Sequence, residues 1–130
     1  MAHGSTLADP VTMMIEAVVD SSVMDMLRGL RIDGEPDPLV ELSNTFAVES
    51  QTRMRQLAAA VETGDYREVR RAAHVIKGMS ATIGALHLSA LSRQIERAEA
   101  GAITDARLNE LEVEIERVSV ALTAAAGRPY

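Results

Sequence analysis

The sequence predicts an all-α fold, an antiparallel up-down four-helix bundle with one or two additional short N-terminal helices. From Asp37 onward, apolar residues recur at steps of three and four, which places them on one face of a helix. Only 2% of the residues are aromatic and none is tryptophan, so the core must be aliphatic, which suits closely packed helices better than sheets. Because the connections are short, successive helices are expected to run in opposite directions.

The N-terminal part of the chain predicts short helices followed by a loop. Residues 11–30 indicate one or two short helices, broken near residues 20–22, where Asp and Ser can cap a helix start. Residues 31–38, RIDGEPDP, predict a loop because glycine and proline discourage regular structure. The opening MAHGS is typical of a cloning remnant, so His3 receives no functional weight, and residues 1–10 are expected to be disordered or cloning-derived.

Four longer helices follow, and capping residues mark their ends. The expected markers are Asp37 and Gly64 for the first helix, Asp65 and Gly84 for the second, Gly101 for the end of the third, and Thr104 or Asp105 for the start of the fourth. We expect a single domain over residues 11–126. The tail AAGRPY is expected to fray, and residues 127–130 are placed outside the domain.

Composition and charge exclude several classes of function. The net charge of −6 argues against general nucleic-acid binding, and the absence of cysteine excludes disulfides and thiol chemistry. No run approaches the roughly 18 apolar residues of a membrane span. The start of the chain has no apolar signal segment. We therefore expect a cytoplasmic protein that binds neither membranes nor nucleic acid.

The stretch RRAAHVIKGMSATIGA contains an unexpected glycine. Gly78 lies within a predicted helix, where glycine costs about 1 kcal/mol relative to alanine. His74 is about 100° from Ala73 of the buried stripe, so its ring is expected at the flank of that stripe. Lys77, the only lysine in the chain, and Gly78 share its face at three and four residues. An imidazole that takes up a phosphoryl group needs open approach, positive charge and room, which these residues supply.

At these residues the sequence resembles histidine phosphotransfer (HPt) domains, whose pattern is AHxLKGxxxxxGxxxLxxxxxxLE. The matching residues are Ala73, His74, Ile76, Lys77, Gly78, Gly84, Leu88, Ile95 and Glu96, and the resemblance covers roughly residues 20–120. It departs from the usual pattern at Ile76, where leucine is usual, and at Met79, where a small residue is common.

The resemblance implies a phosphorelay protein without a nucleotide site, which is not an enzyme in its own right. His74 would accept a phosphoryl group from a receiver-domain aspartate and pass it to another, Lys77 would steady its charge, and Gly78 would leave room for it. Glu96 would accept a hydrogen bond from the ring. The chain would bind no cofactor and act as a monomer, with Mg²⁺ held by a response-regulator or hybrid-kinase receiver domain. The residues expected to contact that partner are Arg70, Arg71, Met79, Ala81 and Arg93.

Three other functions fit the sequence less well. A helical interaction bundle that binds receiver or kinase domains without phosphotransfer stays open, although His74, Lys77 and Gly78 together argue against it. A histidine-kinase dimerisation domain would normally carry an acidic residue where this chain has Val75. A helical metal site would need a ligand one turn before His74, where Arg71 stands instead.

Overall fold

The computed structural model describes residues 9–127, and these residues contain helices and no strand. The predicted all-α fold is therefore confirmed. The elements are α1 (Pro10–Val18), α2 (Ser21–Gly29), α3 (Pro38–Thr63), α4 (Tyr66–Thr82), α5 (Leu86–Arg97), the short 3₁₀ turn η2 (Ala100–Ala102) and α6 (Asp105–Ala126). None of the helices within residues 9–127 is both long and apolar enough to cross a membrane.

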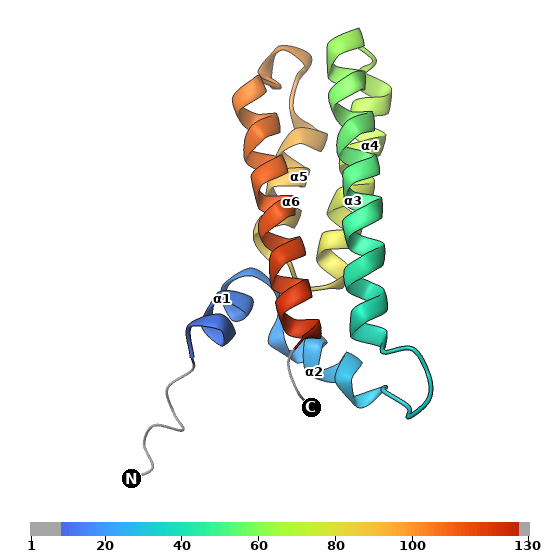
Figure 1. Ribbon diagram of the computed structural model, residues 1–130. Coiled ribbons are helices and arrows are strands. Elements are labelled where there is room, and N and C mark those ends of the chain that lie inside the picture. Colours follow the sequence, from blue (N-terminus) through green and yellow to red (C-terminus); the bar gives the residue numbers. More distant parts are fainter. Residues whose placement is uncertain (1–8, 128–130) are drawn as a thin grey trace.

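Helices α3 to α6 lie side by side, and each runs opposite to the one before it (Figure 1). Helix α3 packs on α4 and α6, and α5 also packs on both, which closes the bundle around one core. The two short helices lie at the end of the bundle where α3 begins, with α1 against α6 and α2 against α3 (Figure 1). As the composition required, the largest fully buried side chains are almost all aliphatic or methionine: Met24, Leu39, Leu57, Ile76, Leu88, Ile95, Leu111, Ile115 and Leu122.

Short polar side chains start most of these helices. An N-cap oxygen accepts a backbone N–H of the first turn and so satisfies a donor that has no partner within the helix. Asp20 separates α1 from α2 in this way, at the predicted break. Asp65 caps α4 directly after Gly64 has ended α3 with a left-handed φ of +73°. The other side-chain caps are Asp9, Asp37 and Thr104.

The third bundle helix ends four residues earlier than the sequence predicts. Helix α5 stops at Arg97 rather than Gly101, because Ala98 adopts an extended backbone with ψ of 145°. Residues 100–102 then form a 3₁₀ turn, and Ile103 reaches the core with 9% of its surface exposed. Burying Ile103 requires the chain to leave the helix, and this tertiary gain outweighs the helix propensity of the intervening alanines.

The helical region begins one residue earlier than predicted, ends at Ala126 as predicted for the domain, and includes the first two residues of the tail that was expected to fray. Helix α1 begins at Pro10, where proline suits the first helical position, and Asp9 caps it. Ala125, placed in the frayed tail from sequence, is helical and buried, and its carbonyl accepts a hydrogen bond from Nη2 of Arg28 at 3.1 Å. The expectations for residues 1–8, including the cloning remnant, and for residues 128–130 lie outside the described residues.

The turn between α4 and α5 contacts the junction of α1 and α2. Gly84 in this turn has a φ of +71°, in the region that favours glycine. A Cβ added to Gly84 would overlap the Cβ of Asp20 and approach its backbone N at 3.1 Å. Glycine is therefore needed at this position for two reasons, the backbone conformation and the close approach.

We predict that Gly84→Ala destabilises the protein more than Gly64→Ala. Both positions have positive φ, which costs an L-residue about 1–2 kcal/mol. Only Gly84 lacks space, since a Cβ at Gly64 meets nothing within 4 Å. Urea unfolding should give a loss of about 1 kcal/mol for Gly64→Ala and a larger loss for Gly84→Ala. Equal losses would show that the N-terminal helices do not pack tightly on this turn.

Candidate functional site

Helix α4 divides its surface between the core and solvent. Its buried residues are Val69, Ala72, Ala73, Ile76 and Ser80, which include the stripe predicted from the sequence. His74 follows this stripe and is directed outward, with 65% of its side chain exposed. The helix thus presents an imidazole ring at the surface while its backbone is held by the core behind it.

A carboxylate on α5 links this imidazole to the neighbouring lysine. Oε2 of Glu96 lies 2.6 Å from Nδ1 of His74, and Oε1 accepts a hydrogen bond from Nζ of Lys77 at 2.6 Å. The Glu96 side chain is only 20% exposed and that of Lys77 28% exposed. The three residues form one connected cluster across the α4–α5 seam.

The charge state of Glu96 determines which ring nitrogen is free. Hydrogen bonds from Lys77 and from His74 hold the pKa of Glu96 below its usual value of 4.5, although partial burial opposes this. At neutral pH the carboxylate is ionised and can only accept hydrogen bonds, so Nδ1 of His74 must carry the proton. In the neutral ring, Nε2 then has a free lone pair on the exposed side.

Gly78 leaves the surface beside His74 open. A Cβ added at this glycine meets no atom within 4 Å, so no packing contact requires its small size. Gly78 lies one turn after His74 on the same helix face, and any longer side chain there would stand next to the imidazole. The arrangement gives a nucleophilic nitrogen, an adjacent cation and free space.

The residues predicted to contact a partner differ in their surroundings. Arg70, Ala81 and Arg93 are exposed. Arg71 is held by the carboxylate of Glu68 on the same helix, with hydrogen bonds of 2.8 and 3.2 Å. Among the residues expected to contact a partner protein, Arg71 is therefore one whose guanidinium group is already bound to a carboxylate of the same chain.

Met79 is half-buried and lines an apolar groove that the sequence did not reveal. This groove of about 300 Å³ lies between α3 and α4 and is also lined by Leu42, Phe46, Val75 and Ile83. Leu42 and Phe46 lie four residues apart on α3, a spacing that by itself predicts only a shared apolar face toward the core. The groove could have been predicted from Val75 and Met79. These two apolar residues are one turn apart and lie outside the buried stripe of α4, so they form a second apolar patch on that helix.

Residues 9–127 contain no group of three or more His, Asp or Glu side chains arranged to hold a metal ion. The cluster at His74 contains one carboxylate, that of Glu96, and one ammonium group, that of Lys77, and this ammonium can attract an anion to the ring.

Known proteins resemble the chain in sequence pattern and in fold. No curated protein sequence matches the chain. The chain is similar to the crystal structure of histidine-containing phosphotransfer protein B (HptB) from Pseudomonas aeruginosa PAO1, with 28% sequence identity and a TM-score of 0.67. That similarity covers 81% of this chain and 90% of the other. The sequence model of the Hpt domain matches residues 41–121, which include every residue of the His74 cluster and more than half of the chain, and the chain therefore belongs to the Hpt domain family.

Proposed function

We propose that this chain is a phosphorelay intermediate in which His74 accepts a phosphoryl group from a receiver-domain aspartate and passes it to a second receiver. The observation that carries the proposal is the hydrogen bond between Nδ1 of His74 and Glu96. This contact leaves Nε2 unprotonated on an exposed ring, next to the open surface at Gly78.

In the transfer step, the lone pair of Nε2 attacks the phosphorus of the aspartyl phosphate. A P–N bond forms, the P–O bond to the aspartate breaks, and the aspartate leaves as a carboxylate. The proton stays on Nδ1, so the phosphorylated ring is cationic and the carboxylate of Glu96 offsets its charge. Transfer to the next receiver is the reverse reaction with a new carboxylate as nucleophile.

Lys77 would act on the phosphoryl oxygens without leaving Glu96. Its ammonium group has three N–H donors, and one of them is used in the hydrogen bond to Oε1 of Glu96. The others remain for an anion bound beside Nε2. Mg²⁺ would be supplied by the receiver, in which carboxylates next to the reactive aspartate would hold the ion.

The receiver would dock over α4, with His74 at the centre of the contact. On one side of His74, the apolar groove lined by Val75 and Met79 offers a place for apolar side chains. Arg70 and Arg93 are exposed on α4 and α5 and would face acidic groups of the partner. We propose a single domain over the helical region that acts as a monomer in this contact.

Phosphotransfer profiling against the receiver domains of the source organism tests the proposal. Each receiver is charged with acetyl phosphate and mixed with wild type or His74→Gln. We expect acid-labile label on the wild type and none on His74→Gln. If His74→Gln gains the same label, another residue is the acceptor. Receiver binding without any transfer would favour the non-catalytic interaction bundle.

Gly78→Gln should separate stability from transfer. Replacing a helical glycine with glutamine should raise the free energy of unfolding by about 1 kcal/mol, while the new side chain blocks approach to His74. We expect the transfer rate to fall at least roughly tenfold, because small displacements of reacting groups are costly. Gly29→Gln on α2, where a Cβ also meets open space, is the control and should transfer normally. A fully active Gly78→Gln would show that the glycine does not provide access.

Glu96→Gln should change the pH dependence of stability. Because the folded pKa of Glu96 is lowered, its stabilising contribution is complete above 4.5 and is lost as the pH falls through the folded value. At pH 7 we expect Glu96→Gln to lose about 1 kcal/mol, a modest value since the cluster is partly exposed. The difference from wild type should vanish at lower pH in urea unfolding. The exposed Glu116→Gln is the control, and a pH-independent loss for Glu96→Gln would contradict the assignment.

A further inference from the structure

Two helices have a net positive charge in an acidic protein. Helices α4 and α5 together contain six Lys or Arg residues and two Glu residues, a net charge of +4. The whole chain has a net charge of −6, so the remaining residues carry −10. The molecule is therefore electrically asymmetric, with its positive part on the helices that hold His74 and Glu96.

The arginines on these two helices also differ in their contacts. Among residues 9–127, the arginines on the other helices each have a side-chain partner, such as Asp25 for Arg28 and Glu114 for Arg117. Four exposed arginines have no hydrogen bond or ion pair with another described residue. They are Arg67, Arg70, Arg93 and Arg97, and we call them the arginine ridge.

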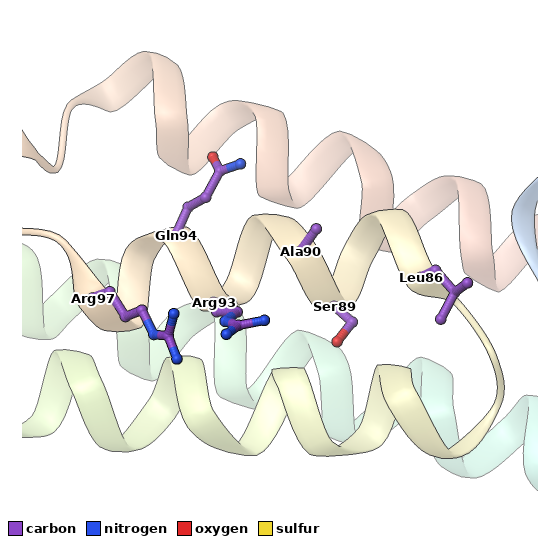
Figure 2. A pocket seen from close by; sticks show the side chains of 6 residues that line it. All are labelled: Leu86, Ser89, Ala90, Arg93, Gln94 and Arg97. Carbon is purple, nitrogen blue, oxygen red and sulfur yellow. The ribbon is translucent and has the colours of Figure 1, made fainter.

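The arginine ridge lies along the α4–α5 seam beside His74. On α4, Arg67 and Arg70 precede His74 by seven and four residues and share its helix face. On α5, Arg93 lies one turn before Glu96 and Arg97 follows it directly. The side chains of Arg93 and Arg97 extend on the side of α5 that faces α4 (Figure 2). Because α4 and α5 are antiparallel, the C-terminal end of α5 lies beside the middle of α4, where Glu96 contacts His74 and Lys77 (Figure 1).

A receiver domain is acidic where it must approach His74. Its reactive aspartate and the carboxylates that hold Mg²⁺ make that pocket negative, and a bound phosphoryl group adds further negative charge. A chain of net charge −6 would repel this pocket from most directions. An approach along α4 and α5, whose net charge is +4, brings unlike charges together.

We propose that the arginine ridge binds the acidic rim of the receiver's phosphorylation pocket and orients the encounter so that His74 meets the aspartate. This inference rests on the proposed function. It adds Arg67 and Arg97 to Arg70 and Arg93, the arginines already expected to face acidic groups of the receiver. The ridge acts on association, whereas Glu96 and Lys77 act on the transfer itself. Exposed arginines without internal partners keep all their donors available for carboxylates of another molecule.

The test compares charge reversals on and off the ridge. The variants are Arg97→Glu and Arg93→Glu, and the control is Arg55→Glu on α3, which makes the same charge change beside α6 at the opposite side of the bundle. The rate of transfer from a charged receiver, identified by the profiling above, is measured below saturation. At about 50 mM salt we expect a roughly tenfold slower rate for each ridge variant and little change for the control. At about 500 mM salt the difference should shrink, since charges are then screened within about 5 Å.

Phosphoramidate, a small phosphodonor that needs no docking, separates the two proposals. Wild type and ridge variants should be labelled on His74 at similar rates by this compound. If wild type and both ridge variants accept the phosphoryl group from the receiver at equal rates at low salt, the proposed role of the arginine ridge is wrong and the proposed function still holds. An equal loss for Arg55→Glu, or a loss that persists at high salt, would overturn the role of the ridge as well. If neither phosphoramidate nor any receiver labels the wild type, the proposed function itself fails.

Discussion

The candidate site depends on one carboxylate that is shared between two helices. Glu96 on α5 accepts hydrogen bonds from His74 and Lys77 on α4, both at 2.6 Å. This shared contact fixes which ring nitrogen carries the proton and where the lysine ammonium lies. It also joins α4 to α5 at the surface, above the core contacts of Ile76 and Ile95. The same group thus supports the helix pair and, by binding Nδ1, leaves Nε2 of the neutral imidazole without a proton.

The bundle allows this arrangement because α4 is held firmly from behind. Small residues of α4, such as Ala72, Ala73 and Ser80, are buried and permit close packing against α3 and α5. A rigid backbone lets His74 remain exposed without losing its orientation. Gly78 lowers the helix propensity, yet no neighbouring atom requires its small size. The cost of glycine inside the helix is consistent with a functional requirement for space.

The arrangement of charged residues extends beyond the His74 cluster to the arginines of the whole described region. Most arginines in the described part of the chain contact acidic or polar side chains of their own helix or a near neighbour, as Arg71 does with Glu68. The arginine ridge is different because its four members are unpaired and lie on the two site helices. A basic patch on an acidic chain favours orientations in which that patch meets an acidic partner. The apolar groove beside Val75 adds a second, uncharged part to this surface.

The sequence by itself determined the all-α fold, most helix boundaries and the identity of the phosphoacceptor candidate. These features follow from local rules. A helix cap such as Asp65 is recognised from the residues next to it, and the shared helix face of His74 and Gly78 follows from their spacing of one turn. Tertiary structure decided where α5 ends, because burial of Ile103 outweighs local helix propensity. It also decided that Glu96 binds both His74 and Lys77, and which arginines stay unpaired. Such contacts join residues about twenty positions apart, and their geometry exists only after α4 and α5 have packed together.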